Sequence, residues 1–285
     1  MNKLIIFLLC SVVWTGIGAA NVQADVTFPY VDVKNNGKFD QGDIGKDSGV
    51  DICALIFNDG KFDTKIAEGN YVPPANPASL VIPAGAKMTT SKFKNQKFDL
   101  TAEKDVSFLS TVSLTDTDSS VSIEAGGNIH LENSTISSKD YVYIVADGSI
   151  SADGATINSD LAFVEIEPEG DLSIRNAVVN TPKDSVTISS GRNFFANNTN
   201  FKTRYGVDFE SGVNVDKNSL TYDQMDLSGS SLKGNSIAVW TQKSNLTMDN
   251  VTFKSCLADG DQGYVDVEVD NGNKDRKSTR LNSSH

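Results

Sequence analysis

The chain has 285 residues, with 25 Lys and Arg against 37 Asp and Glu, a formal net charge of −12 and 39% hydrophobic residues. The hydrophobic content excludes a disordered chain, and the charged content is too low for a coiled coil. The negative charge argues against nucleic acid as a partner, because binding to phosphates needs a basic surface.

Residues 1–24 have the pattern of a secretory signal peptide. Lys3 supplies a positive start, residues 4–13 form a short apolar run, and residues 22–24 end in a small-residue cleavage site. The apolar run is shorter than the ~20 residues that span a membrane as a helix. We therefore expect a secreted or surface-displayed protein, with no transmembrane segment in this chain.

Residues 25–90 lack the repeat that follows, and we expect them to form a small head that caps the fold. The loop of residues 32–43 places oxygen-bearing groups at positions 1, 5, 7, 9 and 12, with a glycine at position 6. That spacing suits Ca²⁺, which takes six to eight oxygen ligands. The candidate ligands are Asp32, Asn36, the Lys38 carbonyl, Asp40 and Asp43.

This loop resembles the calcium loops of EF-hand and dockerin-type modules, with two departures. Lys34 stands at position 3, where its side chain cannot ligate, and an Asp replaces the Glu of position 12. A partial second copy of the loop lies at residues 58–63, and no helix is obvious after either copy. Asn36-Gly37 and Asp59-Gly60 are also strong signals for two-residue hairpin turns. A calcium site and plain hairpins therefore both stay open.

From about residue 98 the chain repeats every 21–23 residues, with one longer step of 31. Each repeat holds an apolar-x-apolar segment, a turn and a further apolar segment, as in ISADGATI at residues 150–157 and LTMDNVTF at residues 246–253. A second apolar-x-apolar segment, such as Val142-x-Ile144, precedes most copies by eight or nine residues. Alternation with a period of two predicts strands. Three short strands in each repeat describe one coil of a parallel β-helix.

One turn position in successive repeats carries only Asn or Gly. The residues at this position are Asn133, Gly154, Asn176, Asn198, Gly229 and Asn250. Asn and Gly tolerate a positive φ most readily, and a sharp corner between two strands needs that conformation. We therefore expect these corners to lie one above another along one edge of the stack.

With this turn column the chain resembles the right-handed parallel β-helices, including pectin-lyase-like proteins and the passengers of bacterial adhesins. The resemblance implies an all-β solenoid of about seven to eight coils of 21–22 residues over residues 91–274. It names no substrate. We expect a non-catalytic adhesin or extracellular scaffold that binds a glycan or a protein.

Outward positions of the Val142-type strands carry many carboxylates. Glu165 and Glu167 lie two rungs from Asp208 and Glu210, which is roughly 10 Å at about 4.8 Å per rung. Inverting glycosidases hold two carboxyl groups at a similar separation. The alternative function is therefore a polysaccharide-active glycoside hydrolase or lyase that uses these four residues. The Asp-Asp, Gly-His-Gly and Arg-x-Lys motifs of polygalacturonases are missing from the sequence. We therefore expect no catalytic role for these four residues.

Two insertions near residues 212–221 and 254–263 interrupt the regular repeat. Insertions in repeat proteins form loops on one face, which is often the binding face. Trp240 stands at an outward position and Tyr222 borders the first insertion. These two aromatic residues are our candidates for ligand contact, and packing beneath the loops is the other interpretation.

The last eleven residues, 275–285, resemble the translation of a common short-read sequencing adapter. We expect this tail to be non-native, and the natural C-terminus to be missing. The mode of attachment to a cell surface then does not follow from this sequence.

Overall fold

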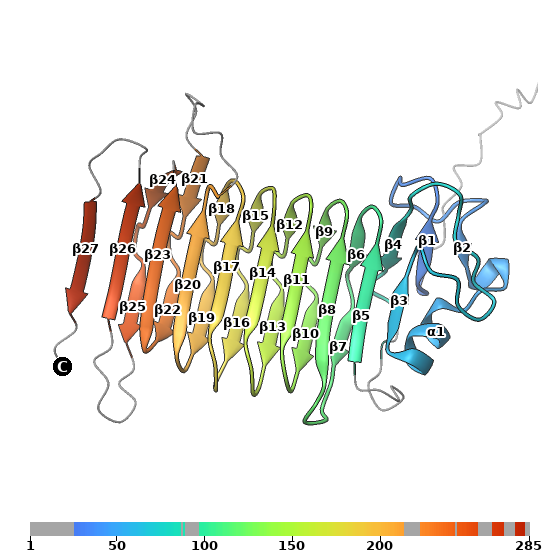
Figure 1. The fold of residues 1–285 in the computed structure, drawn as a ribbon, viewed down its shortest axis with the longest axis horizontal. Helices are drawn as coiled ribbons and strands as arrows, with labels where there is room; N and C mark the ends of the chain where they lie inside the picture. Colours follow the sequence, from blue (N-terminus) through green and yellow to red (C-terminus); the bar gives the residue numbers. More distant parts are fainter. Residues whose placement is uncertain are drawn as a thin grey trace, which may run out of the picture.

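The computed structural model describes residues 26–86, 88, 97–213, 223–242, 244–255, 264–270 and 277–282. They form an elongated stack of short strands with a small head at one end (Figure 1). The described residues contain one α-helix, α1 (Ile52–Asp59), and one 3₁₀ turn, Lys46–Ser48, and both lie in the head. The expected signal peptide and Tyr222 lie outside the described residues.

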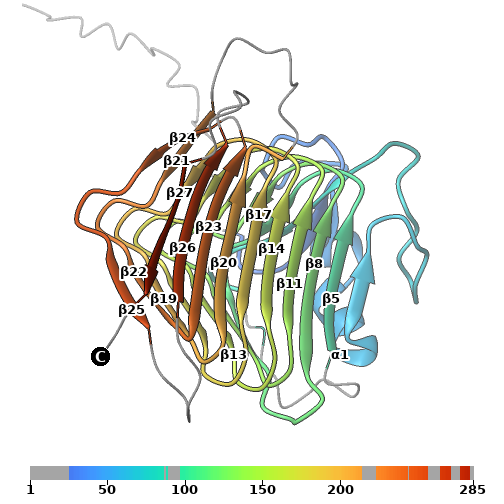
Figure 2. The same ribbon diagram turned by 60° about the vertical axis from the view of Figure 1, so that its left-hand side comes forward.

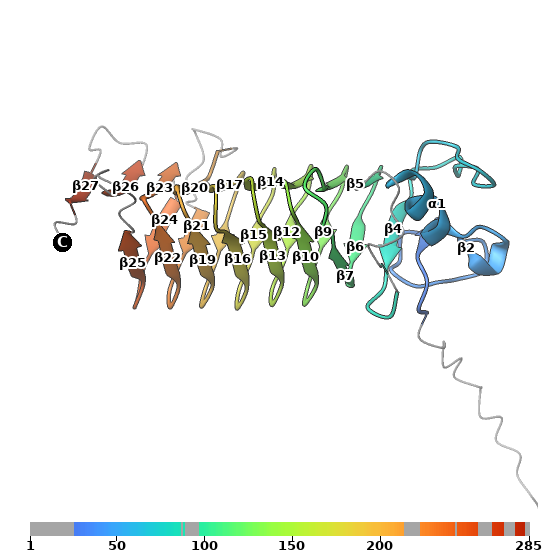
Figure 3. The same cartoon turned by 90° about the horizontal axis from the view of Figure 1, so that it is seen from below.

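Three sheets run along the stack and enclose its core (Figures 2 and 3). Sheet A contains β1 (Tyr30–Asp32), β2 (Ile44–Gly45), β4 (Ser79–Ile82), β6 (Val106–Phe108), β9 (Ile129–His130), β12 (Ile150–Ser151), β15 (Leu172–Ser173), β18 (Phe194–Phe195), β21 (Asp223–Asp226) and β24 (Ser244–Thr247). Sheet B contains β3 (Lys61–Asp63), β5 (Lys97–Ala102), β8 (Ser120–Ala125), β11 (Val142–Ala146), β14 (Val164–Pro168), β17 (Val186–Ser190), β20 (Gly206–Ser211), β23 (Ser236–Gln242), β26 (Tyr264–Asp270) and β27 (Lys277–Asn282). Sheet C contains β7 (Thr111–Ser113), β10 (Thr135–Ser138), β13 (Thr156–Ser159), β16 (Val178–Thr181), β19 (Asn200–Thr203), β22 (Ser231–Gly234) and β25 (Thr252–Ser255).

The strand registers confirm the parallel β-helix that the repeat predicts. Val142 of β11 pairs with Val121 below it and with Val164 above it, and the column continues through Val186 to Val207. In sheet A, Ile150 pairs with Ile129 and Leu172 in the same way. Residues one repeat apart therefore stack directly, and the fold is an all-β solenoid of about seven turns.

The inward side chains of the three sheets make one continuous core. Ile144, Ile157 and Leu172 come from different sheets, and each is fully buried. Near the C-terminal half the core contains aromatic rings, with the Phe209 centroid 4.7 Å from that of Phe201. One coil has too little apolar surface to bury by itself, so each rung depends on its neighbours for stability.

The turn column lies where the repeat predicts it. The backbone adopts a positive φ at Asn133 (57°), Gly154 (72°), Asn176 (54°), Asn198 (54°), Gly229 (73°) and Asn250 (55°). Where glycine occupies the column, the asparagine of the preceding rung fills the space: a Cβ on Gly154 would lie 2.5 Å from Asn133 Oδ1. The aligned corners thus follow from one backbone conformation that recurs in the six coils from Asn133 to Asn250.

The head differs from both hairpin interpretations. β1 and β2 pair antiparallel with Tyr30 opposite Gly45, so residues 33–43 form a long loop between them rather than a two-residue turn at Asn36-Gly37. Asp59 is the last residue of α1, and Gly60 caps that helix with φ 74°. A helix that is not obvious from the sequence therefore begins after β2 and ends in the second loop copy. Asp51 supplies the N-cap, because its side chain accepts a hydrogen bond from Ala54 N at 3.0 Å.

The head is also continuous with the coils. β3 pairs in parallel with β5, and β4 pairs in parallel with β6. These two strands of the segment 25–90 therefore extend sheets B and A by a rung, and α1 lies beside that rung at the end of the stack (Figure 1). At the opposite end, β27 adds to β26 in antiparallel fashion. The interpretation of residues 275–285 as an adapter translation stays a prediction.

The turn column predicts different effects of two substitutions at exposed Asn176. Asn176→Ala should lower the free energy of unfolding by about 1 kcal/mol, because alanine adopts a positive φ at a cost that glycine does not have. Asn176→Gly should change it by only a few tenths of a kcal/mol. Chemical denaturation measures both, with Asn200→Ala on the exposed face of β19 as the control. Equal losses in the alanine and glycine variants would contradict the backbone explanation.

Candidate functional site

The outward face of sheet B is the most strongly charged strand surface of the solenoid. Its outward positions form two columns that run along the stack, because Tyr143 pairs with Glu165, Thr187 with Asp208 and Glu210 with Trp240. From β8 to β23 these outward positions carry no Lys or Arg. Their carboxylates are Glu124, Glu165, Glu167, Asp208 and Glu210.

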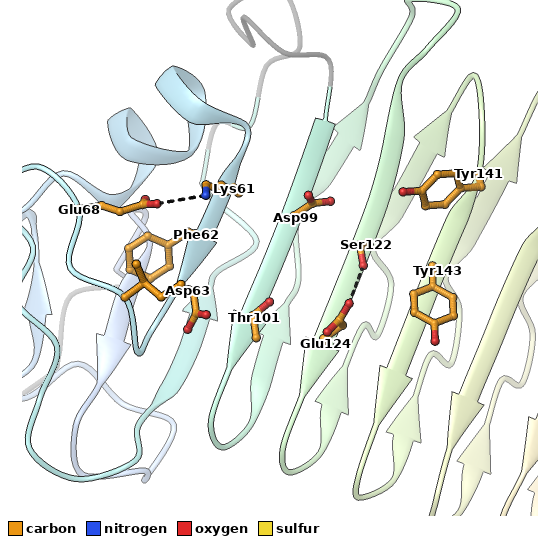
Figure 4. Close-up of a pocket in the computed structure, with 11 residues that line it drawn as sticks. Lys61, Phe62, Asp63, Glu68, Asp99, Thr101, Ser122, Glu124, Tyr141 and Tyr143 are labelled. Carbon is orange, nitrogen blue, oxygen red and sulfur yellow. Dashed lines mark hydrogen bonds and ion pairs between the residues drawn. The ribbon is translucent and has the colours of Figure 1, made fainter.

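A cavity of about 370 Å³ opens on this face where the head meets the first coils (Figure 4). β3 continues sheet B into the head, so Lys61 stands beside Asp99 and Asp63 beside Thr101. Ile66 and Glu68, from the segment after β3, form part of the wall. The remaining lining residues are Phe62, Ser122, Glu124, Tyr141 and Tyr143.

Negative charge in this cavity is only partly balanced. Lys61 Nζ lies 3.9 Å from Glu68 Oε1, while Glu68 Oε2 is buried without a hydrogen-bond partner among the described residues. Burial raises the pKa of Asp99 above its usual value, the nearby Glu124 charge adds to this, and Lys97 and Lys61 oppose it. The raised pKa means that the carboxylate of Asp99 lacks sufficient positive charge or hydrogen bonding around it.

Two tyrosines give the cavity an aromatic side. Tyr141 stacks on Phe163 of the next rung, with ring centroids 5.6 Å apart and planes inclined by 9°. In Figure 4 the Tyr141 ring points along the sheet toward the head. Tyr143 lies on the outward face of β11, where burial and then the charges of Glu167 and Glu165 raise its pKa. Aromatic faces next to carboxylates suit ligands that present both apolar and hydroxyl or amine groups.

The four carboxylates predicted as the alternative catalytic set do share one face. Glu165 is separated from Asp208 by the single residue Thr187 in its column. Burial raises the pKa of Glu165, and the charge of Glu167 and a hydrogen bond to it raise that pKa further. Gln242 Nε2 donates to Glu210 Oε1 at 3.3 Å, which partly offsets the increase in the pKa of Glu210 that burial causes.

Trp240 lies on the same face, as its outward position predicts. It pairs with Glu210 on one side and with Glu268 on the other. The side chain is half-buried, and its indole Nε1 has no acceptor among the described residues. The second aromatic candidate, Tyr222, lies outside the described residues, so no contact between the two is shown.

The head loop uses its carboxylates for internal hydrogen bonds. Buried Asp32 accepts from the backbone N–H groups of Asn36 at 2.8 Å and Gly37 at 2.6 Å through Oδ2. Asp43 accepts from Asp40 N at 2.6 Å, and Lys38 N donates to the Asn36 side chain at 2.9 Å. Within the described residues, no three His, Cys, Asp or Glu side chains converge as a metal site would require. The calcium site at Asp32, Asn36, Lys38, Asp40 and Asp43 stays a prediction.

Comparison with protein-family models, curated proteins and solved structures finds no match to this chain. The geometry of the outward face is therefore the basis for a functional proposal. In the part of the chain that the structure describes, no helix is long and apolar enough to cross a membrane.

Sequence reasoning missed Tyr141 and Tyr143. Tyr143 was within reach, because the repeat places it in the outward column of Glu165. Its position beside a cavity could not be predicted, because the cavity lies where β3 of the head pairs with β5. The pairing continues sheet B, but the sequence of the head does not carry the repeat that would predict it.

The raised pKa of Glu165 predicts a pH-dependent effect of Glu165→Gln. A carboxyl whose pKa is higher in the folded than in the unfolded state binds more protons when folded, so stability falls as pH rises through that window. Glu165→Gln removes this loss and should raise the Tm at pH ~7. At pH ~3.5, below the ordinary Glu pKa of about 4.3, the carboxyl is mostly protonated in both states, so the Tm should not rise. Thermal unfolding at both pH values measures the difference. Exposed Asp118→Asn is the control, and an equal gain at both pH values would contradict the explanation.

Proposed function

We propose that this protein is a non-catalytic extracellular scaffold or adhesin that binds a glycan on the outward face of sheet B. The observation that carries the proposal is the cavity of about 370 Å³ lined by Tyr141, Tyr143 and a group of carboxylates. Sugar rings present apolar C–H faces and hydroxyl groups, and aromatic rings and carboxylates are the side chains that bind these two features. A protein ligand would need a larger complementary surface than this cavity offers.

Secretion is part of this proposal. It is supported by the signal-like pattern of residues 1–24 and by the elongated solenoid, which presents a long surface to its surroundings. The acidic outward face gives no support to a nucleic-acid ligand, because phosphates would be repelled.

A second candidate is a polysaccharide-active glycoside hydrolase or lyase. The observation that favours it is the pair Glu165 and Glu167, in which one carboxyl with a raised pKa is hydrogen-bonded to its neighbour. Environments that push the pKa values of two carboxyl groups apart are typical of acid–base pairs in glycosidases. Asp208 and Glu210, two rungs further on, would complete such a site.

Binding to a panel of immobilised oligosaccharides tests the scaffold proposal. The double variant Tyr141→Ala/Tyr143→Ala should weaken binding by about tenfold or more, because each aromatic contact contributes about 1 kcal/mol and 1.4 kcal/mol is a factor of ten. Phe195→Ala removes an outward aromatic residue from sheet A and should leave the affinity unchanged. Loss of binding in the sheet A control alone, or no binding to any oligosaccharide, would overturn the proposal.

The same panel separates the two candidates. Release of reducing or unsaturated ends that disappears in Glu167→Ala or Asp208→Ala would show an enzyme. Binding without any cleavage, with and without Ca²⁺, supports the scaffold.

We also propose that the head loop binds Ca²⁺, supported by its spacing of oxygen groups and by the burial of Asp32 and Asp43. Ca²⁺ at about 1 mM should raise the Tm of the full chain. If this concentration is about tenfold above Kd, the free energy of unfolding should increase by about 1.4 kcal/mol. Asp40→Ala, at a partly exposed ligand position, should reduce this increase while leaving the Tm without Ca²⁺ nearly unchanged. An unchanged Tm in the wild-type protein would remove the metal from the proposal.

A further inference from the structure

The cavity between the head and the first coils has a specific charge character. Of its lining residues, Asp63, Glu68, Asp99 and Glu124 are acidic and Lys61 is the basic one. Lys61 Nζ is already 3.9 Å from Glu68, and Lys61 is mostly exposed while Glu68 is nearly buried. An empty cavity of this kind is negatively charged, and a positively charged ligand would gain from entering it.

Asp99 is a carboxylate that gains from such a ligand. It is half-buried in the floor of the cavity, between Lys61 of β3 and Ser122 of β8. Within the described part of the chain, its side chain accepts no hydrogen bond, and its raised pKa reflects this burial. Glu124 stands one column away and accepts a hydrogen bond from Ser122 Oγ at 3.3 Å.

The tyrosines favour an organic cation over a metal ion. A positively charged amine is attracted to the face of an aromatic ring as well as to carboxylates. A metal ion needs several oxygen atoms that converge at bonding distance, whereas the acidic residues of this cavity come from β3, the segment after it, β5 and β8. A ligand with several amines can form ion pairs with carboxylates that lie on different rungs, without the carboxylates converging on one point.

The acidic character also continues beyond the cavity. Glu124 of β8 and the pair Glu165 and Glu167 of β14 lie on either side of β11, whose outward residues are Tyr143 and Val145, and none of these outward positions carries Lys or Arg. We infer that the ligand of this face is an amino-sugar oligosaccharide, whose protonated amines lie against the row of carboxylates from Asp99 to Glu167 and one of whose rings packs against Tyr141 and Tyr143. This inference rests on the proposed glycan-binding function and specifies its ligand class.

Calorimetry with a β-1,4-linked glucosamine hexamer tests the inference. The N-acetylated hexamer is the matched probe, because acetylation removes the charges and keeps the chain. The amine form should bind the full-length protein at least about tenfold more tightly than the acetylated form in about 0.15 M salt. Asp99→Asn/Glu124→Gln should lose about tenfold in affinity for the amine form only.

A second variant separates a local site from general attraction to an acidic protein. Asp116→Asn/Asp118→Asn removes two charges from the exposed loop between β7 and β8 and should leave the affinity within about twofold. Equal losses in both double variants would overturn the inference. Equal affinity for the two hexamers would also overturn the inference. If binding still depends on Tyr141 and Tyr143 in that case, the proposed glycan-binding function is retained.

Two other outcomes are also decisive. Binding of an oligolysine peptide without binding of either hexamer would identify a basic protein as the ligand and would overturn the inference. Failure of both hexamers and of the neutral oligosaccharide panel would overturn the glycan-binding function itself. Tm values that are not lowered in the two double variants show that any lost affinity comes from the site and not from unfolding.

Discussion

The in-register stacking of one rung on the next is the constraint on which the structure depends. A parallel ladder places each residue directly over its equivalent one repeat away, so an apolar residue in one coil needs an apolar residue in the next. The Val121, Val142, Val164 and Val186 column shows this requirement. The corner at Asn176 and its equivalents has the same origin, because identical coils must turn with an identical backbone conformation.

This constraint acts on half of the strand positions and leaves the other half to function. Inward residues are fixed by packing, whereas outward residues of sheet B include carboxylates, tyrosines and a tryptophan with no shared apolar requirement. Stacked carboxylates repel one another, and the raised pKa of Glu165 reflects burial together with the neighbouring Glu167. The outward positions from β8 to β23 carry these charges without Lys or Arg, and this supports the proposal of a ligand for this face.

The head both protects the stack and shapes the site. An open end of a solenoid exposes strand edges and core residues, and β3, β4 and α1 cover that end here. Because β3 extends sheet B and the segment after it adds Ile66 and Glu68 to the wall, the strand surface forms a cavity where the head meets the coils. The C-terminal coils continue the same surface with Trp240 between Glu210 and Glu268.

The sequence by itself determined the solenoid, its registers and most of its corners, because period-two alternation and a repeat of 21–23 residues, with one longer step, recur along the chain. It also placed Glu165, Glu167, Asp208, Glu210 and Trp240 on one face, since outward columns follow from the register. Only the tertiary structure decided that Asp59 ends a helix, that residues 33–43 form a long loop and that β3 pairs with β5. Those features arise in the head, where no repeat fixes the pairing and contacts between segments distant in sequence select one of several local conformations that the same residues allow.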